Sequence, residues 1–186
     1  IGRSGQTTGL NRVDKLDSTG LIASGFDELA GLSSGRVVEF ASNSTHVWVA
    51  STFDSDSFFA TSILQGEILL NGSVRWEYGY NLLDDDIINS MNLDGDTMWV
   101  TTAGRGLYSI NLLQRSYSSS PPALHGQMDG MILDDDDGML YVGLMGNQGS
   151  AAGFQSFDTM TGSWGDGSLL AGLPNDIVKD FVGIGA

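Results

Sequence analysis

The chain contains no cysteine and only two histidines, His46 and His125, among its 186 residues. Without cysteine it cannot form a disulfide, a zinc–thiolate site or a thiol nucleophile. It also contains no His-Glu-x-x-His sequence and no Walker sequence, so two frequent kinds of catalytic motif are excluded. These absences favour a binding role over catalysis.

Proline and long hydrophobic runs are also scarce. The chain has 3 prolines against 26 glycines, a balance that is typical of short strands joined by many turns. No run reaches about 18 consecutive apolar residues, the length that a membrane-spanning helix requires. Hydrophobic residues nevertheless make up 41% of the chain, which is enough for a globular domain with a substantial core.

Positive charge is the third scarcity. Lys and Arg total 8 against 23 Asp and Glu, which gives a net charge of -15 at pH 7. Such a surface repels nucleic-acid phosphates and anionic lipid headgroups. We therefore expect no nucleic-acid partner and no membrane insertion. Two interpretations of the acid stay open, namely a solvated surface that serves solubility and the binding of divalent cations.

Apolar-alternating runs recur along the chain in a fixed order. The clearest is Leu173–Phe181, which opens with a Pro-Asn-Asp turn signal, and related runs occupy 32–40, 82–91 and 124–133. We interpret each of these runs as the first strand of a repeat, because period-two alternation after turn residues is typical of strands.

Three further series of motifs follow the first strands. The second series has an aromatic residue at its second position and occupies 47–50, 98–101 and 140–143. The third opens with glycine at 9–14, 106–111 and 153–158, with a divergent copy at 58–63. The fourth is weaker and covers 21–23, 74–78, 116–118 and 163–164. Asp-Gly and Asn-Ser turns between the first two series indicate hairpins.

The four series predict an all-β fold, a β-propeller of about four blades, each a four-stranded antiparallel sheet. The repeat length is roughly 42 to 50 residues, within the range of propeller blades. We place the repeats at 31–81, 82–122 and 123–172, with partial repeats at 1–30 and 173–186, in a single domain or propeller segment. A β-sandwich with accidental similarity between its strands is the alternative.

These motifs resemble the blade of the two-component regulator propeller family. The Leu-Pro-x-Asn-x-Ile part of that blade is similar to Leu173–Val178. The Asp-x-x-Gly-x-Leu-Trp-Ile-Gly-Thr part, with the Gly-Gly-Leu-aromatic sequence after it, is similar to Leu93–Thr102 and Gly104–Tyr108. The stretch Phe53–Ile68 departs from the family because it lacks the Gly-Gly-Leu element. The resemblance implies an exported sensor or interaction domain, in the extracellular space or the periplasm, and implies no activity.

The ends of the chain carry complementary parts of a repeat. Ile1-Gly2 aligns with the close of a second strand such as Val142-Gly143, and Leu173–Phe181 is a first strand. One blade is therefore expected to be split between the N- and C-termini or left incomplete. The incomplete blade could close on its own chain, belong to a larger propeller, or associate with another copy.

A ligand is expected where the loops before the first strands meet the loops between second and third strands, because these loops share one face of a propeller. The polar candidates of this recognition site are Arg36, Asp84, Asp86, Arg105, His125, Gln127, Asp129 and Asn175. For Asn175, together with Asp176, the simpler interpretation is that it only stabilises the turn before its strand. No catalytic residue is assigned.

The acidic turns provide weak candidates for Ca²⁺, and no other cofactor is expected. The candidates are Asp94, Asp96, Asp134 and Asp136. Neither turn has the spacing or the bidentate Glu of an EF-hand, and hairpin formation alone accounts for Asp-Gly sequences.

Three functions are compatible with these patterns. The first is a non-enzymatic binding or sensor propeller that recognises a protein, a glycan or a small molecule. The second is a self-assembling structural subunit joined through the incomplete blade. The third is a polysaccharide lyase or hydrolase on a propeller scaffold, which would require His, Arg and acid to converge at the channel mouth. The sequence favours the first.

Overall fold

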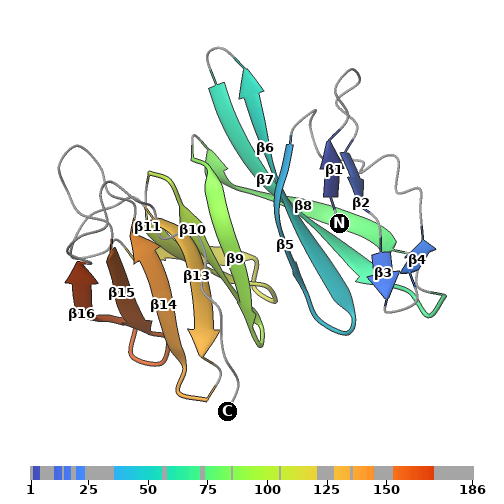
Figure 1. Cartoon of the computed structure of the whole chain (residues 1–186). Coiled ribbons are helices and arrows are strands. Elements are labelled where there is room, and N and C mark those ends of the chain that lie inside the picture. The colour runs from blue at the N-terminus through green and yellow to red at the C-terminus, as the bar shows by residue number, and fades with distance from the viewer. Residues whose placement is uncertain are drawn as a thin grey trace. The chain divides into compact units, whose positions relative to one another are not determined.

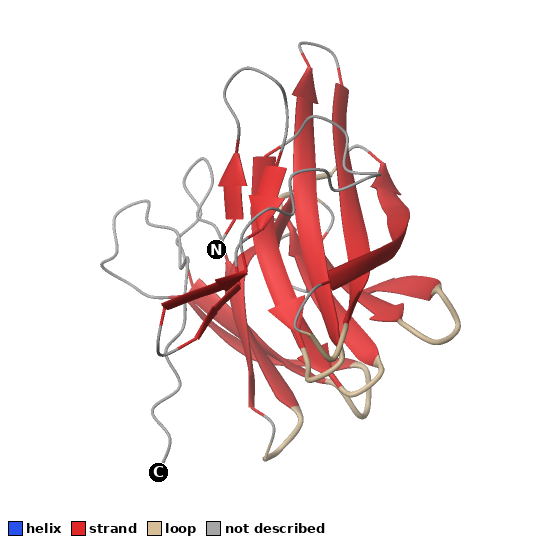
Figure 2. Cartoon of the chain, turned by 90° about the vertical axis from the view of Figure 1, so that its right-hand side faces the viewer, coloured by secondary structure: helices blue, strands red, loops and turns tan. Residues whose placement is uncertain are grey.

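The computed structural model describes residues 2–4, 11–13, 15–17, 20–23, 36–55, 58–71, 74–84, 86–104, 106–120, 128–134, 136–144 and 153–169. Every element within these ranges is a β-strand, as Figure 2 shows. The chain divides into two compact units, Ile1–Ile88 and Asn89–Ala186.

Three four-stranded antiparallel sheets make up most of the described chain, and each is a simple meander (Figure 1). Sheet I consists of β5 (Arg36–Ser42), β6 (His46–Ser55), β7 (Phe58–Ile68) and β8 (Val74–Asp84). Sheet II consists of β9 (Ile88–Asp94), β10 (Thr97–Thr102), β11 (Gly106–Asn111) and β12 (Ser116–Ser120). Sheet III consists of β13 (Met128–Asp134), β14 (Met139–Leu144), β15 (Gly153–Asp158) and β16 (Ser163–Leu169).

The N-terminal region contributes two short hairpins. Strand β1 (Gly2–Ser4) pairs with β2 (Asn11–Val13), and β3 (Lys15–Asp17) pairs with β4 (Gly20–Ala23). The all-β class and the four-stranded antiparallel repeat predicted from the sequence are confirmed. About four blades were predicted, and the described residues form three complete four-stranded sheets. The first strand predicted at 173–181 lies outside the described residues.

The motif series occupy equivalent strands in the three sheets, which confirms their assignment. One detail differs from the prediction, because Leu82–Asp84 do not open the sheet II repeat but end β8. The reason is the length of β7, whose Ala60 and Thr61 provide partners for Asp84 and Leu83. Strand β9 begins only at Ile88.

The strand register places the aromatic residues of the repeat at matching positions. On the second strands, Trp48, Trp99 and Tyr141 lie opposite Gln65, Ser109 and Ser156. On the fourth strands, Trp76, Tyr117 and Trp164 lie opposite Gly66, Ile110 and Phe157. Within each row, the partner on the third strand occupies the equivalent position in all three sheets. The repeat therefore extends to individual cross-strand pairs.

Sheet I requires glycine at one of these pairs. A Cβ atom on Gly66 would lie 2.8 Å from Cε3 of Trp76, which is closer than side chains pack. The indole can therefore cover the third strand only because position 66 has no side chain. Trp76 packs in turn against the buried pair Val49 and Leu64.

One main-chain hydrogen bond recurs at the same end of all three sheets. The last residue of the third strand in sheet I, and the residue after it in sheets II and III, donates its N–H to a carbonyl in the turn between the first and second strands. The bonds run from Ile68 to Thr45 (2.7 Å), from Leu112 to Asp96 (2.9 Å) and from Thr159 to Gly138 (3.0 Å). This turn latch fixes the two turns of each sheet to one another.

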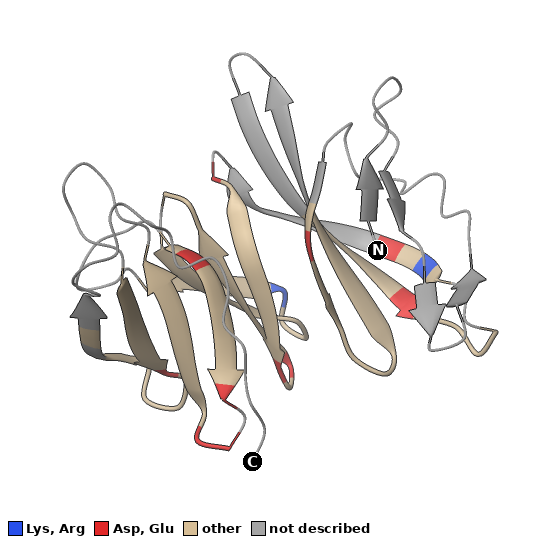
Figure 3. Ribbon diagram, in the orientation of Figure 1, with Lys and Arg blue, Asp and Glu red and all other residues tan. Residues whose placement is uncertain are grey.

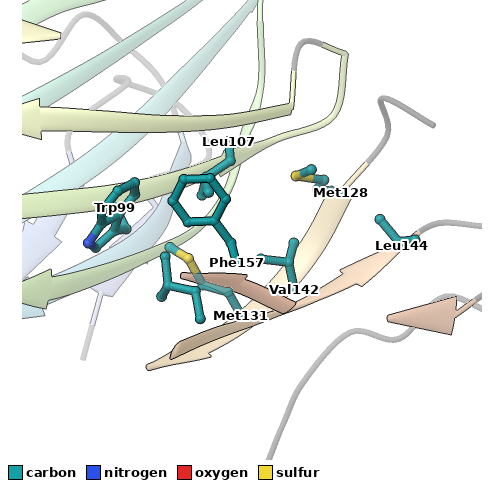
Figure 4. Packing of buried hydrophobic residues seen from close by; sticks show 8 residues of the cluster. Trp99, Leu107, Met128, Met131, Val142, Leu144 and Phe157 are labelled. Atoms are coloured by element: carbon teal, nitrogen blue, oxygen red, sulfur yellow. The ribbon is translucent and has the colours of Figure 1, made fainter. Parts of the chain in front are cut away.

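The core of the second unit lies between sheets II and III. Phe157 is central, because its ring makes edge contacts with Trp99 (5.3 Å between centroids) and Trp164 (4.9 Å). Figure 4 shows Trp99 and Leu107 of sheet II meeting residues of sheet III around this ring. The other buried members are Met128, Met131, Leu140, Val142 and Leu144. Burial of each large apolar side chain contributes about 1.5 to 3 kcal/mol, so this cluster holds the two sheets together.

Candidate recognition site

A β-bulge lies near the start of β13, where sheet III meets sheet II. Met128 pairs with Leu144 and Met131 pairs with Val142, so Asp129 and Gly130 both face Gly143. A bulge leaves part of the strand ladder unpaired and frees main-chain groups for other partners. The first strand of sheet I has a register shift at the equivalent place, between Val37 and Glu39.

The carbonyl groups around the β13 bulge accept hydrogen bonds from sheet II. The hydroxyl of Thr101 on β10 donates to the main-chain oxygen of Asp129. The side-chain amide of Asn89 on β9 donates to the main-chain oxygen of Met128 at 2.6 Å. Two polar side chains of sheet II thus dock on the opening strand of sheet III, which satisfies main-chain groups that the bulge released.

This sheet junction, defined by Asn89, Thr101, Met128 and Asp129, lies at the end of the second unit opposite the turn latches. The first strands begin and the second strands finish at this end. The side chain of Asp129 is half-buried there. The junction therefore places a carboxylate on a rim that two docked sheets hold in position, which suits recognition of a polar or cationic group.

Two of the eight predicted recognition residues have described side chains, namely Asp86 and Asp129. Asp86 is buried in the connection between β8 and β9, where its Oδ1 accepts the N–H of Ile87 at 2.9 Å. This contact is typical of an aspartate that stabilises a turn. Asp129 lies at the sheet junction.

The remaining predicted residues are placed by backbone only or lie outside the described residues. Arg36 begins β5 and Asp84 ends β8, so both lie at the same end of the sheet I meander. Arg105, His125, Gln127 and Asn175 are outside the part of the chain that the structure describes.

The sequence did not single out Asn89 and Thr101, although both contribute to the junction. Each directly follows an apolar pair, Asn89 after Ile87-Ile88 and Thr101 after Trp99-Val100. Thr101 lies on a strand that is otherwise largely buried, and a polar residue in such a place indicates a hydrogen bond to be satisfied. The sequence therefore indicates that the side chain makes a hydrogen bond, but it does not identify the residue that accepts the bond.

The acidic turns considered for Ca²⁺ lie between the first and second strands (Figure 3). In sheet III the turn uses its own carboxylates, because Asp134 Oδ1 accepts the N–H of Asp136 at 3.1 Å and Asp137 Oδ1 accepts that of Met139 at 2.9 Å. In sheet II, Asp94 and Asp96 flank Gly95, which has a φ of 56°. Within the described ranges, no group of three or more His, Asp or Glu is arranged to hold a metal ion. Local turn formation accounts for these residues.

In sheet III the turn between the third and fourth strands is also stabilised by an aspartate, Asp158. Asp158 Oδ1 accepts the N–H groups of Met160 at 2.8 Å and Thr161 at 3.0 Å. These bonds, first of all the one from the Thr161 backbone, hold the pKa of Asp158 below its ordinary value of 3.8. Asn111 has the corresponding role in sheet II, where its Oδ1 accepts the N–H of Gln114 at 2.7 Å.

Comparison with known proteins supports the fold. No protein-family model matches the chain, and no curated protein matches it. Among solved structures, the crystal structure of the computationally designed Ika8 protein is similar over 95% of this chain, with a TM-score of 0.56 and 10% sequence identity. The chain spans 50% of that designed protein. At this identity the likeness concerns the fold alone. The described residues contain no helix long and apolar enough to cross a membrane.

Proposed function

We propose that this chain forms part of a β-propeller that works as a non-enzymatic binding module. The contact between β10 and β13 carries the proposal, because it sets the second strand of one sheet beside the first strand of the next. In the first unit β1, whose Gly2 aligns with Gly143 of the second-strand series, lies against β5 in the same relation. A repeated contact of this kind supports sheets arranged around an axis rather than two packed sheets.

The ligand-binding rim of this module would be the end where the first strands begin. Asp129 is the predicted recognition residue at this end whose side chain the structure describes. The net charge of -15 favours neutral or cationic ligands. A protein, a glycan or a small molecule of that charge would fit. The resemblance to two-component regulator propellers supports a sensor or interaction role outside the cytoplasm.

Ligand screening followed by one matched pair of substitutions tests this proposal. Saturation-transfer NMR would be run with the chain and a panel of neutral sugars, amino sugars and amino acids. Any ligand that binds would then be titrated into Asp129→Asn and Asp136→Asn. Both variants lose one carboxylate, but Asp129 lies at the junction and Asp136 is exposed in the turn at the other end of sheet III. The bond from Thr101 is made to a main-chain oxygen, so the Asp129 variant should stay folded.

We expect affinity to fall about tenfold in Asp129→Asn, the effect of one lost charged hydrogen bond, and to stay unchanged in Asp136→Asn. Conversion of a panel sugar into product would contradict a non-enzymatic role. Equal affinities in the two variants would contradict the assignment of the rim.

A further inference from the structure

Strand β12 differs from the outer strands of the other two sheets. The pairing of β8 with β7 shifts register twice, and the pairing of β16 with β15 shifts once. By contrast, Ser116–Ser120 pairs with Leu107–Asn111 without interruption. The sequence of β12, Ser-Tyr-Ser-Ser-Ser, contains no charge, no glycine and no proline, and its first four residues are exposed.

An edge strand of this kind is open to another strand. Natural sheets protect their edges with charged side chains, prolines, bulges or covering segments. Strand β8 has such protection, since Arg75 forms ion pairs with Glu67 and Glu77. Strand β12 has no charged side chain, no proline and no bulge. Within the described residues it is hydrogen-bonded to β11 alone. Alternate N–H and C=O groups of β12 therefore point away from the sheet.

We propose that β12 is a docking edge for an extended, positively charged segment of a partner protein, which pairs with it as the fifth strand of sheet II. This mode of recognition obtains affinity from main-chain hydrogen bonds and specificity from alternate side chains. The proposal concerns the outer edge of sheet II, so it does not depend on the ligand-binding rim at the sheet junction.

Charge selects the partner. The chain carries a net charge of -15, so a second copy is repelled and a cationic segment is attracted. The exposed residues Asp94 and Asp96 lie at the end where β12 begins, since the turn latch joins Leu112 to Asp96. These two carboxylates outnumber the single cation of the neighbouring turn between β11 and β12, which is Arg115.

The side chains of β12 add a preference for hydroxyl groups and a site for a cation. The hydroxyls of Ser109 and Ser118 lie 2.7 Å apart across β11 and β12. Threonine or serine on an incoming strand would extend this row, because hydroxyl pairs stabilise neighbouring strands. Tyr117 is 51% exposed, so its ring can receive a lysine or arginine side chain.

A designed peptide tests the edge directly. The probe is a fluorescein-labelled nonapeptide of alternating threonine and valine with a lysine at each end. Its first control has glutamate in place of lysine, and its second has proline at alternate positions, which prevents strand pairing. Fluorescence anisotropy measures binding, and amide hydrogen exchange of the wild-type chain locates it. We expect the lysine peptide to bind about tenfold more tightly than either control and to slow exchange at alternate amides of Ser116–Ser120.

Two substitutions complete the test. Ser118→Lys places a repelling charge in the middle of the edge, and Ser44→Lys adds the same charge in an exposed turn of sheet I. The first should weaken binding about tenfold and the second should leave it unchanged. Thermal unfolding confirms that each variant is folded, and the exchange experiment on the wild type needs no variant. Equal binding by the two variants, or protection outside β12, would overturn the proposal. A dimer without peptide, with Ser116–Ser120 protected, would do so too by making a second copy the occupant.

Discussion

The hydroxyl of Thr101 in sheet II donates a hydrogen bond to the main-chain carbonyl of Asp129 in sheet III. A second bond runs from the side-chain amide of Asn89, on the first strand of sheet II, to the main-chain carbonyl of Met128 beside the same bulge. The junction between the sheets thus contains directed polar bonds in addition to the apolar contacts around Phe157.

Thr101→Val should destabilise the second unit. The substitution keeps the shape of the side chain but removes the donor, so the Asp129 carbonyl loses this bond. The expected cost is about 1 to 2 kcal/mol, measured as the free energy of unfolding in urea. Thr97→Val on the same strand is the control, since Thr97 lies beside the turn, away from the junction. Equal losses in the two variants would show that the Thr101 bond contributes nothing specific.

Trp48→Phe and Trp99→Phe should differ although they remove the same atoms. The indole N–H of Trp48 donates to Gln65 Oε1 at 3.0 Å. The N–H of Trp99 is buried and makes no hydrogen bond to any residue that the structure describes. Loss of a satisfied bond should make Trp48→Phe the more destabilising by about 1 kcal/mol. The measurement is thermal or urea unfolding of each variant, and a larger loss at Trp99 would contradict the expectation.

Arg115→Gly should stabilise the chain and Gly162→Ala should destabilise it. Both positions directly precede a fourth strand and have left-handed backbone, with φ of 55° at Arg115 and 67° at Gly162. That conformation costs a non-glycine residue about 1 to 2 kcal/mol, partly offset by the freedom that glycine adds to the unfolded chain. Opposite shifts of the unfolding midpoint are therefore expected. Shifts of the same sign would contradict the conformational explanation.

The carboxyl group of Asp158 should titrate below pH 3.8 in the folded chain. The N–H groups of Thr161 and Met160 stabilise its charged form, so the folded pKa lies below the unfolded value. The contribution of this group to stability is complete above pH 3.8 and is lost as the pH falls through the folded pKa. Carbon-13 NMR titration of the side-chain carboxyl measures the midpoint, and a midpoint at or above 3.8 would refute the expected direction.

Asp158→Asn provides the control for that titration. It keeps an Oδ1 acceptor for the turn, as Asn111 does in sheet II, but it has no proton to gain. Unfolding followed between pH 5 and pH 2 should therefore depend less steeply on pH in the variant than in the wild type.

The strands were predictable because their signals are local. Alternation and the recurring aromatic positions at Trp48, Trp99 and Tyr141 identified the second strands, and the register later matched them across all three sheets. The length of β8 was not predictable, because it depends on partners in β7. The contacts of Asn89 and Thr101 join residues far apart in the sequence and depend on a bulge that alternation does not reveal.

The candidate site was less accessible to prediction than the fold. Asp129 was singled out for its side chain, whereas the bond that positions it uses its main-chain oxygen. Asp86 was singled out as a binding residue, and the contact the structure assigns to its Oδ1 is with the next residue. Turn-forming and ligand-binding aspartates have the same sequence appearance, because both follow from short side chains that accept main-chain hydrogen bonds.

The turn latches make the two ends of each sheet unequal as sites for engineering. At the latched end the turns are tied to one another, so an insertion there has to keep the bond from Ile68, Leu112 or Thr159 in place. At the other end the connections between second and third strands, residues 56–57, 103–105 and 145–152, already differ in length. Loop grafting at that end should therefore leave the sheets intact, and the repeat could acquire new specificities there without redesign of its core.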